Sequence, residues 1–177
     1  YIPSWAHFSF VVMEPGDPAR SDLTIRPRVS NLPGPRGLPL FKPPYSQLVA
    51  LDMNAGEALW SVPLGDGPRD HEALRGLDLA PLGNYDKSGG PLLTKTLLFI
   101  ADGAPRMWGM PNEGWDWGGG NRFRAFDKAT GEQIWEMELS HGATGAPMTY
   151  LHEGRQYIVV ALGGVDQKSE LVALALP

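Results

Sequence analysis

Hydrophobic and polar residues alternate over short stretches along most of the chain, which is the pattern of half-buried β-strands. Strands are predicted at 47–52, 58–64, 97–102, 122–127, 133–139, 146–151, 156–162 and 170–176. A further strand is expected at 7–13, and residues 1–5 have the pattern of a strand that is separated from the rest of its sheet. Residues 14–46 contain so many prolines that a long connection with little regular structure is expected. Only one helical turn is expected, within 66–86, so the chain is predicted to be all-β.

An eleven-residue phrase occurs twice, at 50–60 and again at 125–135, with Ala, Asp, Gly, Glu and Trp at matching places. Each copy predicts a strand, a tight turn and a second strand, because the Asp can bond the turn backbone and the Gly supplies a positive φ. Trp60 and Trp135 then open the second strand. A repeated hairpin of this kind is a stacking unit, since one sheet cannot bury its own faces. The repeat therefore predicts a β-propeller.

Composition and charge narrow the class of protein. The 22 glycines and 17 prolines are typical of a turn-rich all-β chain. A net charge of −5 without a basic stripe excludes a nucleic-acid partner, because nothing would replace the phosphate counterions. No apolar run approaches the roughly 18 residues that cross a membrane. Cysteine is absent, which excludes disulfides and thiolate metal sites.

The repeated pattern Ala-x-Asp-x-x-x-Gly-x-x-x-Trp resembles the tryptophan-docking motif of the pyrroloquinoline quinone (PQQ) dependent dehydrogenases. These enzymes are eight-bladed propellers in which each such Trp packs between neighbouring blades. The resemblance extends over nearly all of the chain after Gly37. It includes the segments at 37–43, 89–91, 144–150 and 154–160, and a tail at 163–177 that is similar to the C-terminal end of the glucose and alcohol dehydrogenase branch.

The length of 177 residues limits how much of such a propeller is present. A blade needs about 40–45 residues, so we expect about two blades with parts of their neighbours. The chain begins at Tyr1 without an initiator Met or a signal sequence, which predicts a C-terminal fragment of an eight-bladed β-propeller. The expected divisions are a partial strand with a Pro-rich connection at 1–46, a first-motif blade at 47–102, an aromatic and Gly-rich insertion at 103–121, a second-motif blade at 122–164 and a closing strand at 165–177.

The resemblance implies a function for the complete enzyme. It would oxidise an aldose, the favoured substrate, or another alcohol with PQQ and calcium, and would pass electrons to ubiquinone or a cytochrome c. The expected location is the periplasm, with attachment to the inner membrane through N-terminal segments. The base, the calcium ligands and the ring that stacks on PQQ belong to earlier blades, so this chain alone is expected to be inactive. The alternative is a non-catalytic propeller of the same repeat family that binds protein partners, although such scaffolds lack the long insertions seen here.

The resemblance also implies which residues lie at the rim of the PQQ site. Tyr45 and Ser46 stand where the family commonly has a Trp-Gly pair that contacts the cofactor. Gly89 and Gly90 match a family turn at which glycines allow the backbone to approach a flat cofactor closely. Ordinary propeller turns would use the same residues, so both interpretations stay open.

Two more rim positions follow from the glycine pair near the end of the chain. After this pair the family usually has a Trp or a His near the cofactor or the substrate, whereas this chain has Gly164 followed by Val165. The difference at Val165 puts the PQQ contact and the substrate preference in question. Both residues are also compatible with a plain turn.

Other candidates for chemistry have simpler explanations. Trp60 and Trp135 are predicted to be docking residues rather than substrate binders. Asp52 and Asp127 occupy the same place before a turn, so turn capping is expected rather than general-base catalysis. The four histidines show no metal-ligand spacing.

Overall fold

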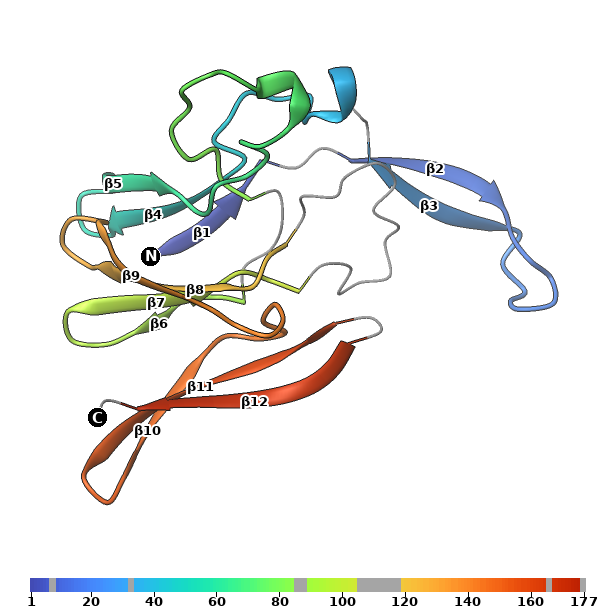
Figure 1. The fold of residues 1–177 in the computed structure, drawn as a ribbon. Helices are drawn as coiled ribbons and strands as arrows, with labels where there is room; N and C mark the ends of the chain where they lie inside the picture. The colour runs from blue at the N-terminus through green and yellow to red at the C-terminus, as the bar shows by residue number, and fades with distance from the viewer. Residues whose placement is uncertain (7–8, 32–33, 85–88, 105–118, 165–166, 176–177) are drawn as a thin grey trace.

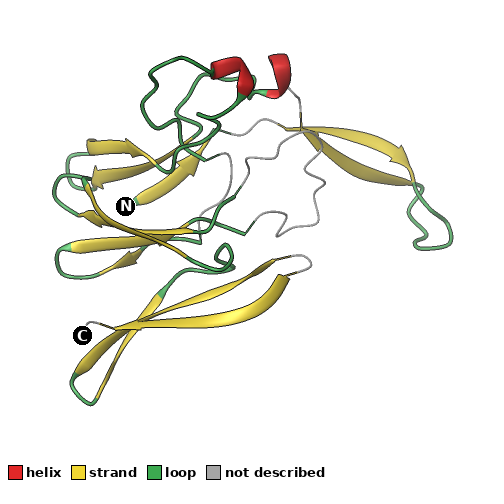
Figure 2. Ribbon diagram, viewed as in Figure 1, coloured by secondary structure: helices red, strands yellow, loops and turns green. Residues whose placement is uncertain are grey.

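The computed structural model describes residues 1–6, 9–31, 34–84, 89–104, 119–164 and 167–175. Almost all of its regular structure is β-strand, with two short 3-10 helices (Figures 1 and 2). The strands are β1 (Ile2–Trp5), β2 (Ser9–Pro15), β3 (Ile25–Asn31), β4 (Ser46–Asp52), β5 (Glu57–Pro63), β6 (Leu92–Leu93), β7 (Leu97–Ala101), β8 (Arg122–Asp127), β9 (Gln133–Glu138), β10 (Met148–His152), β11 (Arg155–Gly164) and β12 (Gln167–Ala175). The helices are η1 (Pro35–Gly37) and η2 (Glu72–Leu74). The predicted all-β class is confirmed.

Three antiparallel sheets contain most of the strands. Their strand orders are β1-β4-β5, β6-β7-β8-β9 and β10-β11-β12, and we call them sheets 1, 2 and 3. The sheets are stacked in chain order (Figure 1). Among the described strands, β2 and β3 pair only with each other. The stacking of repeated antiparallel sheets is what the sequence repeat predicted.

Two hydrophobic clusters hold the stack together. The first joins sheets 1 and 2, and its buried members are Leu48, Leu64, Leu98, Ile100 and Phe126. The second joins sheets 2 and 3, and its buried members are Ala101, Phe123, Leu139, Ala143, Val160 and Leu162. Sheet 2 therefore contributes to both cores, because alternate residues of β7 and β8 point to opposite faces.

The two copies of the repeated phrase form the hairpins β4–β5 and β8–β9. In the first turn, Oδ1 of Asp52 accepts hydrogen bonds from the backbone N–H groups of Asn54 at 2.8 Å and Ala55 at 3.3 Å. In the second turn, Asp127 accepts the equivalent bonds at 2.8 and 3.0 Å. Gly56 follows with a φ of 71°, and its counterpart in the second turn has a φ of 76°. Both aspartates cap turns, as predicted.

The backbone N–H groups of Thr130 and Ala129 lower the pKa of Asp127 below its ordinary value of 3.8. A depressed pKa in the folded state means that the carboxylate stabilises the fold above about pH 4 and loses this effect as the pH falls through the folded pKa. Asp127→Asn should therefore lower the urea midpoint at pH 7 more than at pH 3. An equal difference at the two pH values would show that the charge of Asp127 does not contribute.

Trp60 packs against the turn of the second motif. Its Nε1 donates a hydrogen bond to the carbonyl of Lys128 at 3.1 Å, and the Tyr1 ring lies 5.7 Å from the indole, centroid to centroid. A Cβ added at Gly131 would lie 2.7 Å from Cε3 of Trp60. Only a glycine therefore leaves room for the indole, and Trp60 docks between two sheets as the motif predicts. Trp135 packs edge-on against Phe123 but is 42% exposed.

The prediction of little regular structure over 14–46 is wrong, because β3 lies within that range and pairs with β2. The strand expected at 7–13 corresponds to β2, whereas β3 was missed because prolines surround it and Pro27 lies within it. Pro27 lies opposite Met13 in a two-stranded ladder, and proline is tolerated where a strand has a free outer edge.

The N-terminal segment also differs from the expectation of a strand separated from its sheet. β1 pairs with β4 over four residue pairs, from Ile2 opposite Val49 to Trp5 opposite Ser46. The connection between them is long, so local sequence gave no sign of this pairing. The expected helical turn within 66–86 is present as η2, where Nδ1 of His71 accepts a hydrogen bond from the N–H of Ala73.

Tight turns and long connections lie at opposite ends of the sheets (Figure 1). The tight turns span 53–56, 94–96, 128–132 and 153–154. The opposite end, which we call the loop end, is where β1, β5, β7, β9 and β11 end, and the connections that follow the first four of these strands are longer than the tight turns. Binding and catalytic residues are found disproportionately on loops held by a rigid scaffold, so the loop end is where a site is sought.

Candidate functional site

Asp102 organises the loop end of sheet 2. It follows β7 directly, and its side chain is 4% exposed. Its Oδ1 accepts hydrogen bonds from Nη1 of Arg124 at 2.6 Å and Nδ2 of Asn84 at 3.0 Å, and its Oδ2 accepts one from the backbone N–H of Arg122 at 3.1 Å. Arg124 is 3% exposed and also donates from Nε to Glu136 at 2.7 Å. Such pairing is required for a carboxylate to remain charged away from water.

This Asp102 network connects all three sheets. Oδ1 of Asn84 accepts a hydrogen bond from the N–H of Gly67 at 3.0 Å, which ties in the connection after sheet 1. The carbonyl of Asp102 accepts one from the N–H of Ala143 at 2.8 Å, which ties in the connection before sheet 3. The sequence prediction did not include these residues. The available sign was Arg124, a cation that stands between the apolar residues Phe123 and Ala125 in strand β8.

Tyr45 and Ser46 lie beneath the 64–84 connection. The Ser46 hydroxyl donates to the carbonyl of Leu64 at 2.9 Å, and the residue is 3% exposed. A Cβ at Gly83 would collide with the Ser46 carbonyl, so the connection passes very close to it. The backbone N–H of Tyr45 donates to Leu82 at 2.7 Å, and burial raises the pKa of the Tyr45 phenol. The phenol therefore stays protonated at neutral pH.

Gly89 and Gly90 lie where sheet 2 meets the connection that leads into sheet 3. A Cβ at Gly89 would collide with the carbonyl oxygen of Gly145, and one at Gly90 would lie 3.3 Å from Cβ of Ala146. Gly90 also has a φ of 88°, which favours glycine. The close approach that these glycines permit is thus to neighbouring backbone.

Gly164 lies at the loop end of β11, opposite Gln167 of β12. A Cβ at Gly164 would lie 2.7 Å from Oε1 of Gln167 and 3.7 Å from Cβ of Ala104. That Oε1 is buried and has no hydrogen-bond partner, alone in this respect among the side chains that the structure describes. Val165 lies outside the described residues. All the predicted positions that are described lie at the loop end. The surroundings of Gly89 and of Gly164 are linked, because Ala143 lies beside Gly89 and bonds to Ala104, which lies beside Gly164.

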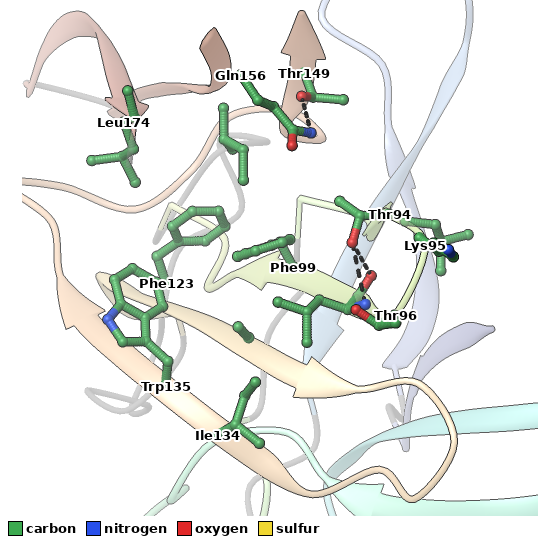
Figure 3. A pocket seen from close by; sticks show the side chains of 15 residues that line it. Thr94, Lys95, Thr96, Phe99, Phe123, Ile134, Trp135, Thr149, Gln156 and Leu174 are labelled. Atoms are coloured by element: carbon green, nitrogen blue, oxygen red, sulfur yellow. Dashed lines mark hydrogen bonds between the residues drawn. The ribbon is translucent and has the colours of Figure 1, made fainter. Parts of the chain in front are cut away.

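A hollow of 880 Å³ lies at the other end, between sheets 2 and 3. Figure 3 shows Phe99, Phe123 and Trp135 on one side of it and Leu174 on the other. None of the predicted site residues line it. The segment 171–174 repeats the Leu-Val-Ala-Leu of 48–51. The described side chains that line the hollow come from sheets 2 and 3 and from the turn at 94–96.

The sequence model of the PQQ family, described as the glucose/ethanol/alcohol dehydrogenase β-propeller domain, matches residues 14–158. The chain belongs to this family. It is 33% identical over 141 residues to the quinate/shikimate dehydrogenase (quinone) of Acinetobacter baylyi, covering 76% of this chain and 15% of that one. It is 30% identical over 162 residues to the quinoprotein glucose dehydrogenase of Escherichia coli, covering 88% and 18%. The chain thus spans less than a fifth of the length of these relatives.

A solved structure supports the fold of this quinoprotein segment. The quinohemoprotein alcohol dehydrogenase of Pseudomonas putida HK5 superposes with a TM-score of 0.51 at 20% identity, covering 92% of this chain and 20% of that one. The three sheets are therefore blades of a β-propeller. Sheet 2, with four strands, has the strand number of a whole blade.

The described residues of this quinoprotein segment fit a PQQ site in part. The space beside Gly89 and Gly90 is filled by the next connection, so these two glycines offer no open cradle. The buried amide of Gln167, beside Gly164, is the polar position that a ligand could satisfy. An amide can present either its oxygen or its nitrogen, so it suits the carboxylates, carbonyls and N–H of a quinone cofactor.

Two kinds of feature are absent from the part of the chain that the structure describes. There, no three His, Asp or Glu side chains gather as ligands for a metal. The same residues include no helix with the length and hydropathy needed to span a membrane.

Proposed function

We propose that this chain is the C-terminal part of the eight-bladed propeller of a periplasmic PQQ- and calcium-dependent dehydrogenase. The supporting observation is the family match over 14–158, together with the docking of Trp60 on the second motif. The substrate is an aldose or another polyhydroxy alcohol. The electrons pass to a quinone or a cytochrome c, and preceding segments attach the enzyme to the inner membrane.

The names of the relatives support this substrate class. They are dehydrogenases of quinate and shikimate, of glucose and of glycerol, and each of these substrates carries several hydroxyl groups. A site for such substrates needs polar groups that hydrogen-bond the hydroxyls. A ligand without these hydroxyls would leave the polar groups of the site buried and unpaired, which lowers its affinity. Aldose remains the favoured member of the class.

The residues of this chain would hold and shape one side of the site. The cofactor, when bound, supplies the acceptor for the two electrons of alcohol oxidation. Gly164 and the Gln167 amide offer a contact at its rim, with Val165 beside them in sequence, and Tyr45 offers a phenol that stays protonated. Ser46, Gly89 and Gly90 contribute indirectly. Ser46 bonds the carbonyl of Leu64, and the two glycines allow the connection before sheet 3 to approach closely, so all three fix the backbone around the site. The base and the calcium ligands come from other blades.

The experiment is reconstitution of the full polypeptide with PQQ and calcium, followed by dye reduction with glucose, quinate, glycerol and ethanol. PQQ-dependent turnover of a polyhydroxy substrate is expected, at higher kcat/KM than with ethanol. A folded polypeptide that binds PQQ in no assay and reduces no dye would overturn the proposal and leave the protein-binding scaffold as the alternative.

The 177-residue chain by itself should be catalytically silent. In the proposed enzyme the base, the calcium ligands and the ring that stacks on PQQ come from other blades, so dye reduction should stay at the level of the buffer when PQQ, calcium and glucose are added. Fluorescence titration should likewise show no micromolar PQQ binding. Calcium- and PQQ-dependent turnover by this chain alone would contradict the assignment of the active site to other blades.

A further inference from the structure

The β2–β3 hairpin has one face that is entirely apolar over its outer half. Met13 lies opposite Pro27, Pro15 lies opposite Ile25, and Val11 lies two residues before Met13. Residues that face each other across an antiparallel pair, or that are two apart on a strand, share one face. These five residues therefore form a continuous surface, which we call the hairpin face.

The hairpin face is uncovered by the described part of the chain. Val11, Met13 and Ile25 are 59%, 55% and 55% exposed. The hairpin stands away from the three stacked sheets (Figure 1), and neither hydrophobic cluster includes any of its residues. Contiguous exposed apolar surface of this kind marks a contact site.

The opposite face of the same hairpin is suited to water. Glu14 lies opposite Arg26 and binds it at 3.3 Å, and it binds Arg28 at 2.8 Å. Phe10 and Val12 share that face but are 37% and 39% exposed, less than Val11, Met13 and Ile25. The two faces thus differ, because the hairpin face carries no charged residue, whereas the opposite face carries the ion pairs of Glu14 with Arg26 and Arg28.

A membrane surface does not fit the hairpin. Residues 9–31 carry three acidic side chains (Glu14, Asp17, Asp22) and three arginines, so they have no net charge to attract anionic lipid. The turn at the tip contains two of the three acids, which would have to enter the headgroup layer first. Interfacial segments instead combine an apolar face with an excess of Lys and Arg.

A second copy of the chain does not fit either. Five side chains that are about half exposed offer on the order of 300 Å², whereas a stable complex buries about 800 Å² on each partner. A patch of this size is sufficient for a partner on the same polypeptide, because tethering gives the partner an effective concentration in the millimolar range. The chain spans less than a fifth of the length of its relatives, so a large part of such a polypeptide is available as a tethered partner.

We propose that the hairpin face packs against an apolar surface of the same polypeptide outside residues 1–177. The hairpin leaves the stack from its loop end, between β1 and β4, so the contact lies on the side that carries the proposed active site. The hairpin acts as an arm that ties the loop end of these blades to a distant part of the protein. The inference rests on the proposed function, in which the chain belongs to a longer dehydrogenase.

Methionine oxidation in the unsubstituted full polypeptide tests whether the face is covered. Met53 is 83% exposed and lies in a turn, which makes it an internal control for Met13. Both should oxidise at similar rates if the hairpin is free, because oxidation follows exposure. If the face is covered, Met13 should react about tenfold or more slowly than Met53 in dilute peroxide. Equal rates would overturn the proposal.

Photo-crosslinking identifies what covers the face. A photoreactive amino acid at position 13 should join the hairpin to peptides outside 1–177 within one polypeptide, and the same probe at position 12, on the other face, should not. Cross-links between two copies, to lipid, or equal at the two positions would each contradict the proposal. PQQ-dependent activity is measured on the same preparation. If the protein is inactive but still forms the intramolecular cross-link, only the proposed dehydrogenase function is rejected and the inference about the hairpin face stands.

Discussion

Trp60→Ala should lower the free energy of unfolding of this chain by about 3–5 kcal/mol, the usual cost of deleting a large aromatic side chain from a packed interior. The indole fills the space between sheet 1 and the turn at 128–131, and its Nε1 donates to the Lys128 carbonyl. Gly131 and the Tyr1 ring close around it. The deletion leaves a cavity that neither rigid neighbour can fill, so the sheet interface loses both packing and a hydrogen bond.

Trp135→Ala is the matched control, because the two tryptophans occupy the same place in the repeat. Trp135 is 42% exposed beside the hollow between sheets 2 and 3, so its deletion should cost less than half as much. Urea unfolding followed by far-ultraviolet circular dichroism measures both variants without relying on tryptophan fluorescence. An equal loss in the two variants would mean that docking on the next turn is not what makes Trp60 important.

Asp102→Ala should also be strongly destabilising, by about 3–5 kcal/mol, because it leaves a buried cation without its closest partner. Arg124 would keep only Glu136, whose side chain is 32% exposed. Asn84 would lose its acceptor on sheet 2 at the same time. The effect should therefore extend across sheets 1 and 2, with faster amide exchange in the 64–84 connection as well as at 102–104.

A double-mutant cycle separates the charge effect from the loss of packing. Arg124→Met removes the cation, so Asp102→Ala combined with Arg124→Met should cost clearly less than the sum of the two single changes. Asp52→Ala serves as the control, since that aspartate caps an exposed turn and should cost about 1 kcal/mol or less. If the loss of unfolding free energy in the double variant equals the sum of the losses in the two single variants, Asp102 and Arg124 do not act as a pair.

Local sequence was sufficient for most of the strands, although not for β3 and β6, and for the class of fold. Apolar alternation located β4, β5, β7, β8 and β9 to within about a residue or two at each end, and the Asp and Gly of each repeat predicted the turns at 53–56 and 128–132. These features depend on interactions within a few residues, namely side-chain direction along a strand and turn hydrogen bonds. The repeat also identified the family, because the position of the Trp relative to the turn is itself a local feature.

The roles of the predicted site residues depended on contacts that the sequence does not display. Gly89 and Gly90 match a family turn, but only the structure shows that Gly145 and Ala146 occupy the space beside them. Ser46 appeared available for a cofactor until its hydroxyl was found to donate to Leu64. A residue type can suit a site while its hydrogen bond or its space is already used by a segment far away along the chain.

The sequence by itself determined that this chain is a stack of antiparallel hairpins, since turn chemistry and strand periodicity are encoded residue by residue, and its repeated motif placed it in the PQQ propeller family. Only the tertiary structure decided that β1 joins β4 across the long connection, that β3 pairs with β2 despite Pro27, and that Asp102 and Arg124 meet between buried strands. The physical reason is the same in each case. Long-range pairing is selected by the burial and hydrogen bonding of the whole chain. A short stretch of sequence does not indicate which distant segment will pair with it.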